Sequence, residues 1–143
     1  MNHPPIIVDT NVVIAGLLTT RNGSAVHVEA AQIYQGMLSA QISFVLSEAL
    51  LAEYRAVLTR AQLCARHAMT ADEVDTLLRD LAACATVLLP VNAPPAPDPG
   101  DQLLWELLAA RADLLLVTGD KLLLRDAGMR GRVITPLRFL TGI

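Results

Sequence analysis

The chain has 143 residues, which is the length of one domain with a substantial core. A hydrophobic fraction of 53% and a charged fraction of 17% exclude an intrinsically disordered chain and argue against a heavily solvated surface. The formal net charge of −3 lacks the basic excess that many nucleic-acid-binding proteins show. We therefore expect one globular domain over residues 1–143.

Neither a membrane span nor a secretion signal is expected. The longest apolar runs, such as residues 12–18, are too short to cross a bilayer. The N-terminal sequence MNHPPII has no basic region of the kind that opens a signal peptide. Cys64 and Cys84 stand far apart without a C-x-x-C motif, so both are expected to be reduced. These features predict a cytoplasmic protein that does not contact a membrane.

Short apolar runs alternate with helix-like segments along the whole chain. Residues 5–8 predict a buried strand, and residues 11–18 predict a helix that Asp9, Thr10 or Asn11 could cap. After a turn at "NG", helices are expected over residues 24–38, 47–60, 61–67, 70–84, 103–112 and 121–127, with a short one beyond Pro136. Further strands are expected over residues 42–46, 86–90, 114–118 and 132–136.

This alternation of strands and helices is typical of a parallel sheet with helices on both faces. The predicted strands are apolar without an alternating polar face, as is expected when helices cover both sides of the sheet. In such sheets, ligands bind beyond the carboxyl ends of the strands. We therefore expect the functional residues to follow the strands directly.

Three acidic residues fall at that edge of the predicted sheet. Asp9 follows the first strand, Asp120 follows the fourth, and Asp101 opens the helix after the third. Glu53 lies within a helix, where it shares the apolar face with Leu50 and Val57. A carboxylate on the apolar side of this helix, about two turns from the strand end, can reach the same pocket as Asp9.

Carboxylates that converge without nearby cations repel one another, and their pKa values rise. Mg²⁺ and Mn²⁺ relieve this repulsion, because they are hard cations that take oxygen ligands. We therefore expect Asp9, Glu53, Asp101 and Asp120 to hold one of these ions. Each acid also has a simpler interpretation: Asp9 and Asp101 as helix caps, Asp120 as a turn residue, and Glu53 as a solvent-facing side chain.

Two further acids lie close to these in the sequence. Asp98, within the proline-rich loop, is expected to be a turn residue. Glu106 lies about 140° around the helix from Asp101, so it is at best a supporting residue outside the ligand set.

Four stretches in this order resemble the motifs of the PIN-domain family: VDTNV, LSEALLAEYRAVL, the long DPGDQLLWELLAARADLLLVTGDKLLL, and the ending VITPLRFL. The resemblance implies an α/β/α sandwich around a mostly parallel sheet of four to five strands. It places the metal ligands and catalytic acids at Asp9, Glu53, Asp101 and Asp120. It also implies supporting positions at Asn11 and Thr118.

The resemblance extends to the toxins of toxin–antitoxin modules. It implies a metal-dependent endoribonuclease with RNA as substrate, a cognate antitoxin protein as partner, and a homodimer. Many relatives carry a further acid where Leu122 stands, so this sequence departs from the pattern at a position that would help to bind a second metal. Gly100 likewise stands where members of this subgroup often have an acid.

Other functions remain open. A phosphatase of the aspartyl-phosphate type would want a second acid at Asn11, and GMRGRV does not have the pattern or the place of a dinucleotide-binding loop. The strongest rival is a PIN-like module that binds RNA or a protein without cutting, which the acidic charge balance favours. A retained set of four acids argues against that rival, because a scaffold gains nothing from their repulsion.

Overall fold

The computed structural model describes residues 3–129 and 131–142. The strands are β1 (Ile6–Val8), β2 (Val45–Leu46), β3 (Thr86–Val87), β4 (Leu115–Val117) and β5 (Val133–Ile134). The helices are α1 (Thr10–Asn22), α2 (Val28–Leu38), α3 (Glu48–Leu58), α4 (Ala61–His67), α5 (Ala71–Cys84), α6 (Gln102–Leu108), α7 (Lys121–Leu124) and α8 (Pro136–Thr141). Two short 3-10 helices are η1 (Pro99–Asp101) and η2 (Ala127–Met129).

All pairs of strands are parallel. β1, β4 and β5 form one sheet in the order β1-β4-β5, and β2 pairs with β3 in a second sheet. An isolated parallel β-bridge between Ile6 and Phe44 connects the two sheets. The expected parallel α/β fold is confirmed. The expected single sheet of four to five strands is wrong in detail, because β2 and β3 have two residues each and are too short to continue the pairing along β1.

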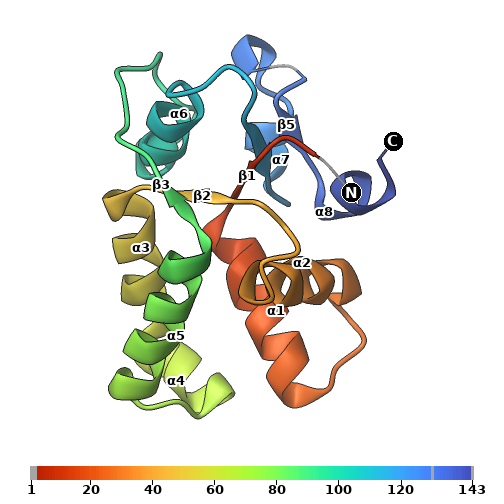
Figure 1. Cartoon of the computed structure of the whole chain (residues 1–143), viewed down its shortest axis with the longest axis vertical. Helices are drawn as coiled ribbons and strands as arrows, with labels where there is room; N and C mark the ends of the chain where they lie inside the picture. The colour runs from red at the N-terminus through yellow and green to blue at the C-terminus, as the bar shows by residue number, and fades with distance from the viewer. Residues whose placement is uncertain (1–2, 130, 143) are drawn as a thin grey trace.

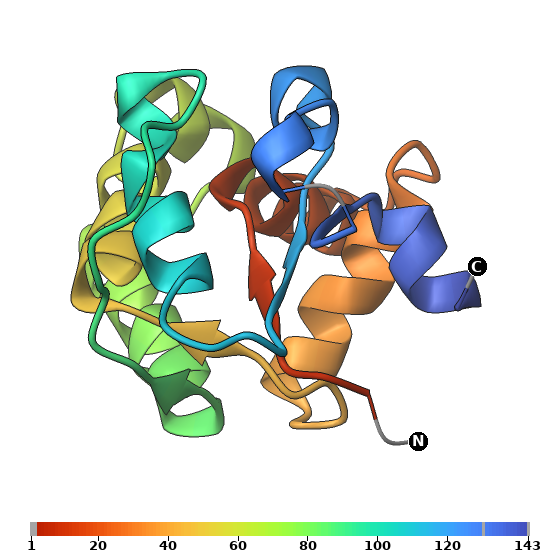
Figure 2. The same cartoon turned by 90° about the horizontal axis from the view of Figure 1, so that it is seen from above.

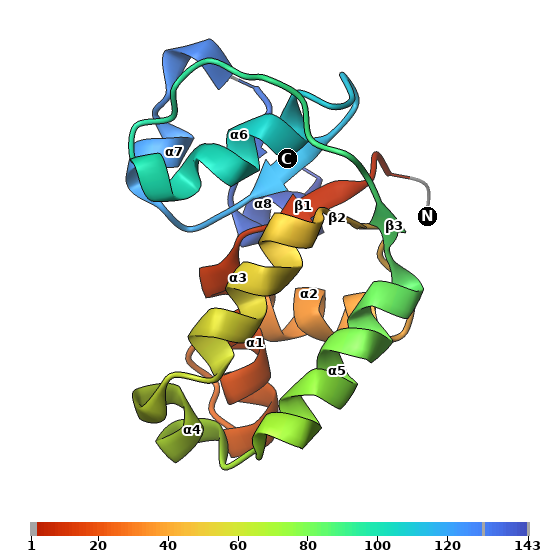
Figure 3. The same ribbon diagram turned by 90° about the vertical axis from the view of Figure 1, so that its left-hand side faces the viewer.

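Helices cover both faces of the central strands. α6 contacts β1 and β4 on one side, and Figure 2 shows α2 and α8 on the other side. The helices α1, α3, α4 and α5 extend away from the strands, as Figure 1 and Figure 3 show. The layers therefore follow the expected α/β/α order.

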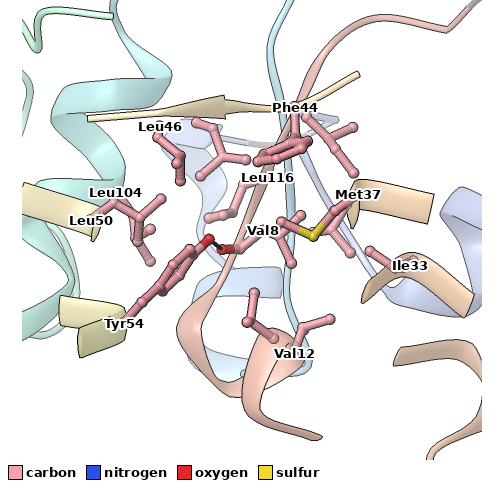
Figure 4. Close-up of a cluster of buried hydrophobic side chains, with 14 of the residues drawn as sticks. Val8, Val12, Ile33, Met37, Phe44, Leu46, Leu50, Tyr54, Leu104 and Leu116 are labelled. Atoms are coloured by element: carbon pink, nitrogen blue, oxygen red, sulfur yellow. Dashed lines mark hydrogen bonds between the residues drawn. The ribbon is translucent and has the colours of Figure 1, made fainter. Parts of the chain in front are cut away.

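The hydrophobic core runs through these layers. In Figure 4, Val8 and Leu116 of the central strands lie between Leu104 of α6 on one side and Ile33 and Met37 of α2 on the other. All five side chains are buried. Burial on both faces explains why the strand sequences are continuously apolar.

Several elements differ in length from the sequence prediction. α1 continues four residues beyond residue 18 and ends at Asn22, and Gly23 caps it in a left-handed conformation with φ of 69°. The strand predicted over residues 86–90 is only Thr86–Val87, and the one over residues 132–136 is only Val133–Ile134. The capping box at the start of α5 is present, with Thr70 and Glu73 each accepting the other's backbone N–H.

α1 and α2 pack closely because of Gly16. A Cβ at this position would overlap the carbonyl oxygen of Ala30 and the Cβ of Tyr34, so only glycine lets the two helices approach this far.

Within residues 3–129 and 131–142, no helix combines the length and apolar character needed to span a bilayer.

Candidate functional site

Asp9 lies at the junction between β1 and α1, where its side chain is only 5% exposed. Its Oδ2 accepts a hydrogen bond from the Thr118 hydroxyl at 2.6 Å, and its N–H donates to the carbonyl of Val117 at 3.0 Å. Asp9 occupies the N-cap position of α1, but its side chain makes no capping hydrogen bond. The helix-cap interpretation of Asp9 is therefore not what the structure shows.

Burial raises the pKa of Asp9 above its usual value. Hydrogen bonds from the Thr118 hydroxyl and the Thr10 backbone lower this pKa, whereas the charges of Glu53 and Asp120 raise it. Asp9 is thus a desolvated carboxyl group whose nearest charged neighbours are other acids.

Glu53 lies on α3, partly buried, with its side chain directed at the start of α1. The Thr10 hydroxyl donates a hydrogen bond to Glu53 Oε2. α3 begins at Ser47, which caps the helix by accepting the N–H of Leu50. Glu53 therefore contacts the residue next to Asp9 instead of turning out to solvent.

Asp120 follows the end of β4 and begins α7. Its Oδ1 accepts the N–H of Leu122 at 2.8 Å, so the turn and cap role considered for this residue is present. Its own N–H donates to the hydroxyl oxygen of Thr118 at 3.0 Å. Thr118, which is fully buried, thereby connects Asp120 with Asp9.

Asp101 lies at the start of α6 and makes no side-chain capping hydrogen bond. Burial, followed by the charges of four carboxylates, raises its pKa from 3.8 to about 6. Three of these carboxylates are Asp9, Asp120 and Glu53, and the fourth is Asp98. The other three predicted ligands therefore lie near enough to Asp101 to raise its pKa.

No basic side chain compensates this acid cluster in the part of the chain that the structure describes. The two ion pairs there, Arg55 with Asp75 and Arg111 with Asp113, do not involve any of the four acids. Asp98 behaves as the expected turn residue, since its Oδ1 accepts the N–H of Gly100 at 2.8 Å. An uncompensated set of carboxylates remains at the carboxyl edge of β1 and β4.

The oxygen-only donors of this cluster fit a hard divalent cation. Among residues 3–129 and 131–142, however, no three or more His, Cys, Asp and Glu side chains are arranged so that they could hold a metal ion together. The carboxylates are close enough to raise the pKa values of Asp9 and Asp101 but are not gathered around one point.

The supporting residues predicted from the sequence lie in different places. Thr118 contacts Asp9 directly. Asn11 is exposed and lines a hollow along α1 that also includes Arg66. Glu106 borders a different hollow, beside the segment 90–92, and is not among the charges that shift the pKa of Asp9 or Asp101. The supporting roles of Asn11 and Glu106 stay predictions.

Two residues that contact the site were not assigned to it from the sequence. Thr10 was considered only as a helix cap, and it holds Glu53 instead. Tyr54, the residue after Glu53, is fully buried, and its hydroxyl donates to the carbonyl of Val8. A buried tyrosine needs a partner for its hydroxyl, and that requirement was the available signal.

Fold and site together define a parallel α/β protein with an acidic centre. This centre lies where the chain switches from β2 and β3 on one side of β1 to β4 and β5 on the other. Residues 5–122 match the PIN domain, and the chain belongs to this family. PIN domains are commonly nucleases. The matched segment includes Asp9, Glu53, Asp101 and Asp120. The comparison with curated proteins gives no match.

Proposed function

We propose that this chain is an endoribonuclease that depends on Mg²⁺ or Mn²⁺ and hydrolyses phosphodiester bonds in RNA. The observation that carries the proposal is the acid cluster, in which burial and then the charges of neighbouring acids, the other three predicted ligands among them, raise the pKa of Asp101 to about 6. Such a concentration of uncompensated negative charge costs free energy in a protein that does not bind a cation.

Asp9, Glu53, Asp101 and Asp120 would hold the ion. When bound, such an ion lowers the pKa of a water molecule and stabilises charge on the phosphoryl and leaving oxygens. Asp9 is oriented by Thr118 and Glu53 by Thr10, so two of the acids are already fixed by hydrogen bonds. Asp101 joins the ligand set once it has lost its proton, which occurs above about pH 6.

Among residues 3–129 and 131–142, we find no serine or cysteine hydrogen-bonded to a histidine that could act as a nucleophile. His67 is buried, and its ring nitrogens contact the backbone of Leu58 and Met69 at 2.8 and 2.9 Å. Both ring nitrogens of His67 are therefore engaged by backbone groups around the end of α4. Attack by a water molecule, with the acids orienting the reacting groups, is the chemistry that fits these residues.

We further propose that the protein is a toxin that acts in the cytoplasm, forms a homodimer and is blocked by a cognate antitoxin protein. The support is the resemblance of the motifs together with apolar residues on the surface. Val87, Leu89 and Val91 are 57%, 85% and 46% exposed on the segment that leaves β3. An exposed apolar row of this kind suits a protein contact.

One observation favours a second candidate, a PIN-like module that binds RNA or a protein without cleavage. In the described ranges no three acids are arranged to hold an ion together. If the carboxylates stayed apart when Mn²⁺ was added, binding without cleavage would be the better description.

A cleavage assay tests the proposal. Labelled RNA is incubated with the protein in Mn²⁺, in Mg²⁺ and in excess EDTA, and the Asp9→Asn variant controls for contaminating nucleases. We expect cleavage in either ion and none with EDTA or with the variant. Undiminished cleavage in EDTA would refute the metal dependence, and RNA binding without cleavage would favour the second candidate.

For the toxin role, the antitoxin is sought in the neighbouring reading frame, where a small DNA-binding protein is expected, and is then purified together with the chain. A strictly monomeric chain without such a neighbour would contradict this part of the proposal.

A further inference from the structure

The peptide group that precedes Asp9 is held from two sides. In a trans peptide the C=O and the N–H point in opposite directions. The N–H of Asp9 donates to the carbonyl of Val117 in β4 at 3.0 Å. The C=O of Val8, on the opposite side, accepts the hydroxyl hydrogen of Tyr54 at 2.5 Å, as Figure 4 shows. One peptide plane is therefore fixed between β4 and α3.

Tyr54 takes a place that a neighbouring strand would normally fill. On the side of β1 that faces β2, the N–H of Ile6 donates to the carbonyl of Ser43 at 3.1 Å, and Ile6 forms the bridge to Phe44. Val8 pairs with Val117 of β4 on one side, but on the side that faces β2 it lies beyond the bridge, and no strand of the described residues pairs with it there. A buried carbonyl without a partner is costly, and Tyr54 removes that cost from a neighbouring helix.

The residue before Tyr54 makes a second connection to the same stretch. Glu53 accepts a hydrogen bond from the hydroxyl of Thr10. Two consecutive residues of α3 thus bond to the two residues that flank Asp9. Because the first connection fixes the backbone on which Asp9 stands, and the second holds the Glu53 side chain, together they determine how the two carboxylates face each other.

We propose that Tyr54 is a positioning residue, which sets the placement of Asp9 relative to Glu53 through its hydrogen bond to the Val8 carbonyl. Its importance for cation binding rests on the function proposed above. The phenol ring is fully buried beside Leu50 and Leu104 (Figure 4), so Phe at this position keeps the packing and removes only the hydrogen bond.

The test compares Tyr54→Phe with Tyr34→Phe. Tyr34 lies on α2 and is also buried, but no hydrogen bond of its hydroxyl to another described residue is observed, so the control makes the same chemical change away from the site. Three properties are measured: Mn²⁺ affinity by calorimetry, thermal unfolding without metal, and amide hydrogen exchange at Asp9 and at Ile6. Ile6 serves as the reference amide at the other end of β1.

For Tyr54→Phe we expect Mn²⁺ binding to weaken about tenfold or more, as is usual when a residue that orients a metal ligand is removed. The amide of Asp9 should exchange faster than in the unmodified protein, while the amide of Ile6 should not change. Tyr34→Phe should alter neither property. Replacing Tyr54 by 4-aminophenylalanine, which restores a donor to the Val8 carbonyl, should recover both.

A role confined to stability would give a different result. If Tyr54→Phe lowered the melting temperature but left Mn²⁺ affinity and exchange at Asp9 unchanged, the positioning role would be overturned. If the unmodified protein neither bound Mn²⁺ nor cleaved RNA, the proposed function would fail, and exchange at Asp9 would still decide whether Tyr54 holds this peptide.

Discussion

The hydroxyl of Thr118 donates to Oδ2 of Asp9 at 2.6 Å, although 109 positions separate the two residues in the sequence. The same hydroxyl oxygen accepts the N–H of Asp120 at 3.0 Å. A single buried side chain at the end of β4 therefore orients the acid that follows β1 and the acid that follows β4. Parallel pairing of these two strands makes the contact possible, because it brings their carboxyl ends together.

Replacing Thr118 by Val should weaken the site. The bond from Thr118 lowers the pKa of Asp9, so its loss should raise that pKa further and leave the carboxylate free to turn. We expect Mn²⁺ affinity to fall about tenfold or more, measured by calorimetry. Thr118→Ser keeps the hydroxyl and should retain most of the affinity. Equal affinities for the Val and Ser variants would show that the hydroxyl is not needed.

Asp9→Asn should abolish RNA cleavage and should not destabilise the metal-free protein. Asn can still accept the hydrogen bond from Thr118, and the substitution removes a buried charge that faces other acids. We expect the melting temperature without metal to stay the same or to rise. Asp98→Asn is the matched control, because Asp98 is exposed and its side chain serves the turn at Gly100. If both variants lost activity equally, the assignment of the essential acid of "DPGD" to Asp101 would be wrong.

The metal-free protein should lose stability as the pH rises from about 4 to about 7. Asp101 has a pKa near 6 in the folded chain, above its ordinary value of 3.8. A raised folded pKa contributes stability that is complete below about pH 4 and is lost as the pH passes through about 6. Burial shifts the pKa of Asp9 in the same direction.

Melting curves of the unmodified protein and of Asp101→Asn across this range isolate the effect. We expect the variant to show a smaller decline toward neutral pH. Asp72→Asn, which changes an exposed acid of α5, should leave the decline unaltered. Parallel curves for all three proteins would contradict the assignment.

Leu122→Asp should improve metal binding. A carboxylate two residues after Asp120 would help to hold a second cation, about 3.5–4 Å from the first in two-metal sites. Leu122 is 60% exposed, so the substitution does not bury a charge in the core and should cost little stability. We expect a lower Mn²⁺ concentration for half-maximal cleavage.

Leu137→Asp provides the control for this substitution, because Leu137 is 55% exposed on α8, which packs against α2. It should not change the metal requirement. Two tight Mn²⁺ sites in the unmodified protein, seen by calorimetric titration, would refute the idea that Leu122 weakens the second site.

The sequence predicted the location of the acids well, because each location follows from a local pattern. An apolar run that ends in an acid places Asp9 at the edge of the sheet. The helical phase of Leu50, Glu53 and Val57 correctly directed Glu53 inward. The charges of Asp9, Asp120 and Glu53 reach Asp101 and raise its pKa, but the convergence of the four acids on one ion stays a prediction.

What the sequence did not predict depends on contacts between distant residues. The bond from Tyr54 to Val8 spans 46 positions, and no periodicity indicates which backbone group a buried hydroxyl will meet. The division into two sheets also depends on tertiary packing, since β2 and β3 each pair over two residues. α1 was predicted too short because polar residues after Leu18 suggested a loop, whereas the helix continues to its glycine cap.

The order of the elements along the chain also governs when the site can be completed during synthesis. Glu53 belongs to the unit of β2 and α3, whereas Asp9 and Asp120 follow strands on the other side of the Ile6–Phe44 bridge. Thr118 and Asp120 follow β4 in the sequence, so a growing chain contains Asp9 and Glu53 well before it contains either of these two residues. The acid cluster, and with it the cation site proposed above, can therefore form only after β4 and the start of α7 have been translated.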